Sequence, residues 1–459
     1  MIGIVAFLIL GAAAIWFGGL NQDEGWYLYA ANLVSEGLVP FVDFDFTQGP
    51  IMPYVYAAFS SAWKNFGLLG ARVVTLSLGA LGIMFSALTA RRLADEGQKK
   101  SAFSITFLLL AVNLYHVYYL TIPKTYALAS LFIAVGFYLL TFEKFHFLSG
   151  VMLALAGATR FSLAALLVVI AIYLFIHRRI ESFNAFIIGA IITLGAVFGW
   201  FMTDFTAEPG LLKAIGYHAA REGFSPVMIV GSLSRLVRFY LPIFIVLGLG
   251  DFKRSRFLAL AFAVVFLIHL FAPHPYEDYQ VPIMSLLAVF AAINIKTDRA
   301  ELMTLGLALA ISFGSPLLEK WTSDGQDRFW TIMKPKSELA MLREAAREIE
   351  ALDPEGTELL TEDTYLAVET NRHVPRRLAM GPFSDVDLLY WKELLEGETA
   401  KVAAFSGYAF AIEVPKGNER SLEEQLATWE LVKDRYVLAS TKERFGQNST
   451  TLLILKKKE

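Results

Sequence analysis

Long apolar runs separated by short polar segments fill the first two thirds of the chain, and the last third is mixed in character. A helix needs about 20 apolar residues to cross a bilayer, and about eleven runs reach or approach this length. They are residues 2–20, 71–90, 102–120, 125–142, 147–159, 161–176, 183–203, 237–250, 257–272, 281–295 and 301–314. The pattern predicts a mostly α fold, a polytopic transmembrane helical bundle of about eleven spans.

Basic residues cluster in four connections between these runs, at 91–100, 178–179, 253–256 and 296–299. Such clusters mark the cytoplasmic side of a membrane protein. All four fall on one side only if 147–176 forms two short spans that turn at Arg160. This arrangement predicts a cytoplasmic N-terminus and an external C-terminus. We interpret 2–20 as a retained helix rather than a cleaved signal peptide, because no basic segment precedes it.

The predicted outer loop at 21–70 contains two amphipathic patterns that favour interfacial helices. The first begins after Asp23 and ends near Gly37, a residue suited to a helix C-terminus. Its apolar stripe is Trp26, Tyr29, Ala30, Leu33 and Val34. The second begins at Pro50 and places on one face Ile51, Tyr54, Val55, Ala58, Phe59 and Ala62.

The composition becomes that of a soluble α/β domain after about residue 334. Helices are predicted at 337–351 and 421–434, and strands at 357–360, 401–405 and 450–455. We therefore expect a transmembrane domain at 1–315 and a soluble extracytoplasmic α/β domain at 316–459.

Composition supports the membrane assignment and excludes some partners. Hydrophobic residues make up 56% of the chain and charged residues only 18%, against about 25% charged residues in soluble domains. The formal net charge of -3 gives no reason to expect a nucleic-acid partner. The absence of cysteine excludes disulfides and thiolate metal sites.

Ionisable groups are nearly absent from the middles of the spans and gather at their predicted outer ends. They are Asp23, Glu24, Asp43, Asp45, Lys124, Arg160, His218, Arg221, His274, Glu277 and Asp278. A transporter would place such groups near the midplane, so their position favours chemistry at the membrane surface. Asp23 also suits a helix cap, and Arg160 suits a headgroup anchor.

The first loop resembles that of the integral-membrane glycosyltransferases of the C superfamily, which include the protein O-mannosyltransferases and the lipid A aminoarabinose transferases. The residues that carry the resemblance are Asp23-Glu24 with Tyr27, Gly37, Asp43-Phe44-Asp45, Gln48-Gly49-Pro50 and Gly67. Later matches are Arg72, Arg91-Arg92, Thr159-Arg160, Tyr217-His218 with Arg221, and His274-Pro275-Tyr276 with Tyr279 and Pro282.

The resemblance implies transfer of a hexosyl or pentosyl group from a polyprenyl-phosphate carrier, with inversion. The acceptor is a glycan, lipid or protein outside the cytoplasm, and the enzyme is a multi-pass protein of the plasma or inner membrane, in contact with membrane lipids. Asp23 is the implied base, with Glu24 beside it.

The residues expected to bind substrate are Asp43, Asp45, Gln48, Lys124, Arg160, His218, Arg221, His274, Tyr276 and Tyr279. Gln48 stands where many relatives have lysine, so other cations must meet the donor phosphate. His274, Glu277 and Asp278 are candidate ligands for a divalent metal ion, and the metal requirement stays open. The alternative function is a transporter or flippase of lipid-linked substrates.

Overall fold

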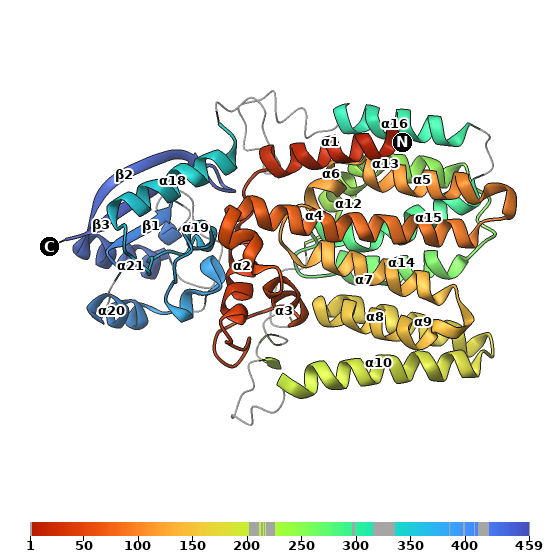
Figure 1. Ribbon diagram of the computed structural model, residues 1–459, viewed down its shortest axis with the longest axis horizontal. Coiled ribbons are helices and arrows are strands. Elements are labelled where there is room, and N and C mark those ends of the chain that lie inside the picture. The colour runs from red at the N-terminus through yellow and green to blue at the C-terminus, as the bar shows by residue number, and fades with distance from the viewer. Residues whose placement is uncertain are drawn as a thin grey trace. The chain divides into compact units, whose positions relative to one another are not determined.

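Helices form most of the chain in the computed structural model, and a small sheet lies near the C-terminus (Figure 1). The structure describes residues 2–201, 211–212, 214, 216, 225–295, 299–314, 336–384, 386–397, 400–407, 409–411 and 422–458. The chain divides into two compact units. Unit 1 comprises Met1–Ala14, Thr47–Met52 and Thr75–Glu319, and unit 2 comprises Ile15–Phe46, Pro53–Val74 and Lys320–Glu459. The predicted functional boundary near residue 315 stays a prediction.

Most helices of the first two thirds of the chain coincide with predicted apolar runs. They are α1 (Ile2–Phe17), α4 (Ser60–Leu93), α5 (Lys99–Ala111), α6 (Leu114–Tyr119), α7 (Thr125–Leu140), α8 (His146–Thr159), α9 (Ala165–Ile176), α10 (Ile180–Phe201), α13 (Leu241–Gly248), α14 (Arg256–Leu270), α15 (Met284–Asn294) and α16 (Ala300–Gly314). The helix α12 (Pro226–Phe239) was not predicted, because it lies almost wholly before the apolar run 237–250. Four 3-10 turns join them, η1 (Glu96–Gln98), η2 (Glu143–Phe145), η3 (Phe161–Ala164) and η4 (Glu277–Ile283).

Two described helices are long and apolar enough to cross a membrane, Ser60–Leu93 and Ile180–Gly199. A third span results if α12 and α13, which are bent by 76°, are counted together. Shorter apolar helices of 10–17 residues are Ile2–Phe17, Thr125–Leu140, Phe161–Ile176, Arg256–Leu270 and Ala300–Ser312. The count of eleven spans therefore stays a prediction.

Two of the apolar runs of unit 1 are interrupted, and a polar residue stands at each interruption. The predicted turn at Arg160 is present, because α8 ends at Thr159 and η3 begins at Phe161. The single span predicted at 102–120 is wrong. Asn113 separates α5 from α6, because its side chain caps the new helix by accepting from the His116 backbone N–H at 3.0 Å.

Glycines allow the helices of unit 1 to approach closely. A Cβ atom on Gly150 of α8 would lie 2.1 Å from the carbonyl oxygen of Phe186 in α10. The reciprocal contact joins Gly189 to the carbonyl oxygen of Phe147, at 2.2 Å. Small residues at such crossings are typical of helices that pack inside a membrane.

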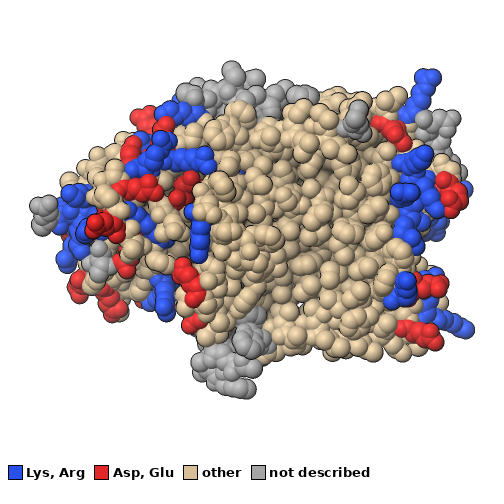
Figure 2. Space-filling model, viewed as in Figure 1, with Lys and Arg blue, Asp and Glu red and all other residues tan. Residues whose placement is uncertain are grey.

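The basic connections of unit 1 meet at one end of its helices. Arg254 donates to the Gln98 side chain at 3.1 Å, and Gln98 donates to the carbonyl oxygen of Ile295 at 3.4 Å. Arg92 donates to the hydroxyl of Thr141, just after α7, at 2.8 Å. Figure 2 shows Lys and Arg gathered at this end of the helices and a wide uncharged surface along them. The side of the membrane that this end faces stays a prediction.

The first predicted surface helix is α2 (Gln22–Ser35), and Gly37 follows its end with a φ of 91°. The exposed polar face expected of an amphipathic helix is wrong, because residues 24–33 are all buried, and its place at the membrane surface stays a prediction. Gly25 explains part of this burial. A Cβ atom there would lie only 2.4 Å from the backbone nitrogen of Tyr365 in α19 (Thr364–Thr370). The helix is therefore a core element of unit 2.

The second predicted surface helix is α3 (Ile51–Ala57), which is shorter than expected because α4 begins at Ser60. On the face predicted to be apolar, Tyr54 and Phe59 are exposed, whereas Met52 and Tyr56, outside that predicted face, are buried. The exposed aromatic side chains are consistent with a helix at a membrane surface.

The C-terminal part of unit 2 combines four helices with a three-stranded antiparallel sheet. The helices are α18 (Glu338–Leu352), α19, α20 (Leu388–Gly397) and α21 (Leu422–Arg435). The strands β1 (Val402–Ser406), β2 (Tyr436–Phe445) and β3 (Thr450–Lys457) take the order β1-β3-β2.

Both predicted helices and two of the three predicted strands of this domain are confirmed. The strand predicted at 357–360 is wrong, since only isolated bridges form there, from Glu358 to His373 and from Leu360 to Ala403. The strand β2 was missed because its side chains do not alternate between buried and exposed, and most are exposed.

The predicted topology can be tested with single cysteines, because the chain contains none. Glu96 is 90% exposed and Lys401 is 70% exposed at the side chain, so both positions are reachable. We expect an impermeant maleimide to label Lys401→Cys on intact cells and to leave Glu96→Cys unlabelled. Both variants should react in detergent. The reverse pattern on intact cells would invert the predicted orientation.

Candidate active site

Asp23 lies in the first turn of α2, where the sequence places it at a nearly fixed distance from α1. The cap of this helix is Asn21 and not Asp23, because the Asn21 side chain accepts from the Asp23 backbone N–H at 3.0 Å. The Asp23 side chain is half-buried, and its Oδ1 accepts from the indole N–H of Trp26 at 3.1 Å. The carboxylate is therefore held in a defined orientation without serving as the helix cap.

Glu24 has both carboxylate oxygens engaged inside unit 2. Oε1 accepts from the Asn21 backbone N–H at 2.9 Å, which completes a capping box. The Arg72 guanidinium donates to Oε1 at 2.6 Å and to Oε2 at 2.8 Å. Neither side chain of this pair is exposed. This arrangement suits a positioning role for Glu24 better than a contact with substrate.

Arg72 joins the end of α1 to the start of α2. It donates to the carbonyl oxygens of Ile15 at 2.9 Å, Gly18 at 3.0 Å and Gly19 at 2.9 Å. With the two bonds to Glu24, these use the five N–H donors of the guanidinium. The pair Glu24–Arg72 thus fixes the turn that carries Asp23.

The remaining first-loop candidates differ in their surroundings. Asp43 accepts from the Val39 backbone N–H at 2.7 Å, so its carboxylate stabilises a turn. Asp45 is exposed, and Gln48 is half-buried. A Cβ atom on Gly49 would lie 1.9 Å from the carbonyl oxygen of Ala158. The segment containing Gln48 therefore lies against the end of α8, two residues before Arg160.

Two cations and three tyrosines of unit 1 form what we name the cation–aromatic cluster: Tyr119, Lys124, Tyr126, Arg160 and Tyr279. The Arg160 guanidinium lies 4.5 Å from the centre of the Tyr279 ring and 5.1 Å from that of Tyr126. The Lys124 ammonium lies 5.0 Å from the Tyr126 ring and 5.9 Å from the Tyr119 ring. Such contacts hold cations in place without neutralising them.

Asp278 also belongs to this region. Its Oδ2 accepts from the Tyr126 hydroxyl at 2.8 Å and lies 3.5 Å from the Lys124 ammonium. Lys124 is the N-cap residue of α7, and the other end of this helix lies near the basic connections. A helix of 16 residues is about 24 Å long. The cluster and the basic connections are therefore at opposite ends of unit 1, the separation that the sequence predicted.

The candidate metal ligands do not come together. Glu277 pairs with Arg235 at 2.9 Å, and Asp278 pairs with Lys124, while His274 stacks on Tyr276 with ring centres 6.3 Å apart. Within the described ranges, no group of three or more His, Asp or Glu side chains has a metal-binding arrangement. Burial raises the pKa of Glu277, the Asp278 carboxylate raises it further, and Arg235 opposes both.

Some site residues were missed, and others cannot be placed. His218 and Arg221 lie outside the described residues. Tyr126 and Arg235 were not predicted, although Tyr126 stands two residues after Lys124 and would follow it into the first turn of α7. His269 was also missed. It contacts the Ser162 hydroxyl at 2.7 Å and the Gln280 side chain at 3.3 Å, and so lies between the segments that carry Arg160 and Tyr279.

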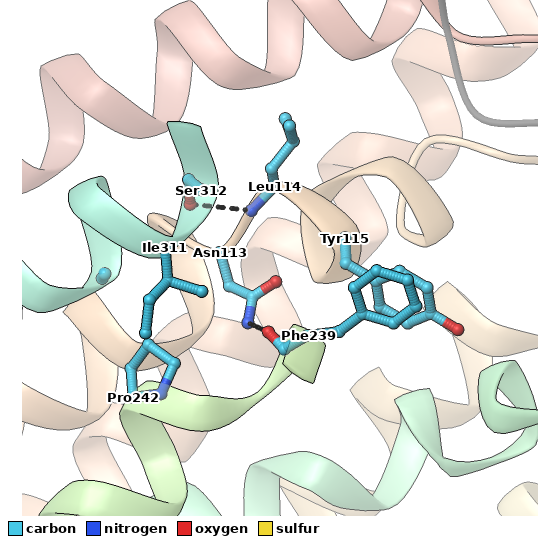
Figure 3. Close-up of a pocket in the computed structure, with 8 residues that line it drawn as sticks. Asn113, Leu114, Tyr115, Phe239, Pro242, Ile311 and Ser312 are labelled. Carbon is cyan, nitrogen blue, oxygen red and sulfur yellow. Dashed lines mark hydrogen bonds between the residues drawn. The ribbon is translucent and has the colours of Figure 1, made fainter. Parts of the chain in front are cut away.

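A small pocket of unit 1 is lined partly by Asn113, Tyr115, Phe239 and Ser312 (Figure 3). Asn113 donates to the carbonyl oxygen of Phe239 at 2.8 Å, and the Leu114 backbone N–H donates to the Ser312 hydroxyl at 3.4 Å. Its volume of about 10 Å³ holds about one water molecule. The pocket is too small for a sugar or a lipid chain.

The fold of the chain is shared with solved membrane-protein structures over nearly its whole length. It is similar to two crystal structures of ArnT from Cupriavidus metallidurans, bound to undecaprenyl phosphate (TM-score 0.63) and in the apo state (TM-score 0.61). Each similarity has 13% identity and covers 99% of this chain and 97% of that chain. The oligosaccharyltransferase of Archaeoglobus fulgidus in its apo form matches with a TM-score of 0.46, at 11% identity over 89% and 71% of the two chains.

No protein-family model and no curated protein matches the sequence. The similarity is one of fold. The chain is accordingly a multi-pass membrane protein, as its apolar helices indicate.

Proposed function

We propose that this protein transfers a sugar from a polyprenyl-phosphate carrier to an acceptor hydroxyl outside the cytoplasm. The cation–aromatic cluster is the observation that carries the proposal, because it presents two cations from helix ends at one end of a membrane bundle. ArnT, whose fold is shared, has been crystallised with undecaprenyl phosphate. In the proposed reaction the donor phosphate binds Lys124 and Arg160.

The proposed step forms a bond from the acceptor oxygen to the anomeric carbon of the sugar. The bond from that carbon to the phosphate oxygen breaks, and the phosphate leaves with the electron pair. The attack comes from the side opposite the phosphate, so the configuration inverts. Phosphate is a competent leaving group, so its departure needs nearby cations and no general acid. Lys124 and Arg160 supply these cations.

Asp23 takes the proton of the acceptor hydroxyl in this proposal, since one carboxylate suffices as a base. The Trp26 indole N–H fixes the Asp23 side chain, and the pair Glu24–Arg72 fixes its backbone. Glu24 is therefore proposed as a positioning residue. Asp43 takes part in a turn, and we leave Asp45 and Gln48 as candidates for contact with the sugar.

One assay tests the proposed function. The purified full-length protein is incubated with a panel of hexosyl and pentosyl polyprenyl phosphates and with candidate acceptors, and release of free polyprenyl phosphate is measured. Release with at least one donor is expected. Movement of intact donors across proteoliposome membranes, without release from any donor, would instead support the flippase alternative.

Arg160 provides a prediction about donor binding. Arg160→Ala should weaken donor binding by about 1.5–3 kcal/mol, the usual loss for a hydrogen bond to a charged group. Arg160→Lys should recover only part, because lysine cannot stack a planar guanidinium on Tyr126 and Tyr279. Donor affinity is measured by titration of the purified variants. Arg179→Ala, an exposed arginine after α9, is the control and should bind as the wild type does. Unchanged affinity in both Arg160 variants would make Arg160 a headgroup anchor.

A further inference from the structure

Asp278 is a carboxylate placed among the cations that are proposed to bind phosphate. It lies 3.5 Å from the Lys124 ammonium, and both side chains are largely buried. The Tyr126 hydroxyl donates to the same oxygen, Oδ2, at 2.8 Å. A carboxylate at this position competes with any phosphate for Lys124, so its presence needs a physical reason.

Three side chains of this region, among those that the structure describes, carry formal charges that act on a phosphate. Lys124 and Arg160 contribute two positive charges, and Asp278 removes one. The neighbouring pair Arg235–Glu277, joined at 2.9 Å, is neutral overall. Asp278 therefore offsets part of the attraction that Lys124 and Arg160 exert on an anion.

The two phosphates that take part in the proposed reaction differ in charge. The donor is a phosphodiester, which carries one negative charge. The product is a phosphate monoester, which carries about 1.5 to 2 negative charges at pH 7 because its second pKa is about 6. A site with two uncompensated cations would therefore hold the product more strongly than the donor.

We propose that Asp278 weakens the hold of the cation–aromatic cluster on the product phosphate more than its hold on the donor phosphodiester. The inference rests on the proposed function and deepens it, because it names a residue that decides between substrate and product. The hydrogen bond from Tyr126 keeps the Asp278 carboxylate turned toward Lys124. Coulomb energy is proportional to the charge of the ligand, so Asp278 opposes a dianion about twice as strongly as a monoanion.

The test compares two ligands that share one lipid chain, farnesyl phosphate and its methyl ester. Asp278→Asn removes the charge and keeps an oxygen that accepts from Tyr126. If this variant of the full-length protein binds the methyl ester about tenfold more tightly, it should bind farnesyl phosphate at pH 8 up to about a hundredfold more tightly. The control Asp251→Asn removes an equal charge just after the C-terminal end of α13, next to the basic connection at 253–256. It should change the affinity for neither ligand.

A pH series separates charge from shape. At pH 5 farnesyl phosphate is mostly a monoanion, so Asp278→Asn should then strengthen both ligands equally. The groups of the surrounding elements that hold charge or titrate in this range are His116, Lys124, Arg160, Arg235, His269 and Glu277. They act on both ligands, so the ratio of the two affinities at each pH isolates the ligand charge.

The outcomes distinguish failure of this inference from failure of the proposed function. Equal strengthening of both ligands at pH 8, or no change in either, would overturn the role of Asp278 while phosphate binding stands. Absence of binding of either ligand to the wild-type protein would overturn the phosphate site itself. A larger gain for farnesyl phosphate that disappears at pH 5 is the supporting result.

Discussion

Asp23→Asn is expected to lower sugar transfer by about two to four orders of magnitude, the usual range for a lost general base, with the fold preserved. The structure makes this variant informative because Asn21, not Asp23, caps α2. Asparagine retains an oxygen that accepts from Trp26. The substitution removes one favourable charge at a helix N-terminus, which is worth about 0.3–1 kcal/mol. Turnover of a lipid-linked sugar by detergent-purified protein is the measurement, with the thermal unfolding midpoint recorded in parallel.

The matched control for this variant is Glu36→Gln at the other end of α2, which removes an equal charge and should leave turnover within about twofold of the wild type. Glu24→Gln is unsuitable as a control, because Glu24 pairs with Arg72 inside unit 2. An Asp23→Asn protein that retains wild-type turnover would show that this carboxylate does not take the proton.

Arg72→Met is expected to cause the largest loss of stability. It leaves the Glu24 carboxylate buried without its cation, which typically costs about 3–5 kcal/mol. It also removes the donor from three carbonyl groups, those of Ile15, Gly18 and Gly19. Thermal unfolding of the purified protein measures the effect, and activity should fall with the population of folded protein.

Two further variants test whether the loss of stability comes from the unpaired buried charge. Glu24→Gln combined with Arg72→Met removes both charges and should be more stable than Arg72→Met alone, because no unpaired charge stays buried. Lys336→Met breaks a largely exposed pair with Glu344 in the same unit and should cost at most about 1 kcal/mol. If Arg72→Met unfolds at the same temperature as Lys336→Met, the buried pair is not what holds the turn.

Local sequence patterns predicted most helices, because an apolar run in a membrane protein has few alternatives to a helix. They failed where the deciding contact is distant in the sequence. The stripe of Trp26, Tyr29 and Leu33 indicated a half-exposed α2, yet the opposite face is covered too. The Tyr29 hydroxyl bonds to Val374, 345 residues away, and burial raises the pKa of Tyr29 to about 12.

The candidate site was predicted to a similar extent. Lys124, Arg160 and Tyr279 were expected at one end of the bundle because each stands at the end of an apolar run. In the structure Lys124 and Arg160 both contact the Tyr126 ring, and Arg160 also contacts Tyr279. The pairing of Glu24 with Arg72 spans 48 residues and joins a surface-loop pattern to a predicted span. No local pattern marks such a pair, so Glu24 looked like part of the chemistry rather than its support.

The dependence of α2 on the C-terminal domain has a consequence for biosynthesis. Gly25 packs on Tyr365, and the buried carboxylate of Glu369 accepts from the Leu68 backbone N–H at 2.7 Å. The ribosome makes the first loop more than 300 residues before these partners exist. Until translation ends, the apolar side chains of α2 lack their final cover and are open to chaperones and proteases. A chain that ends before residue 365 therefore leaves α2 without part of its cover.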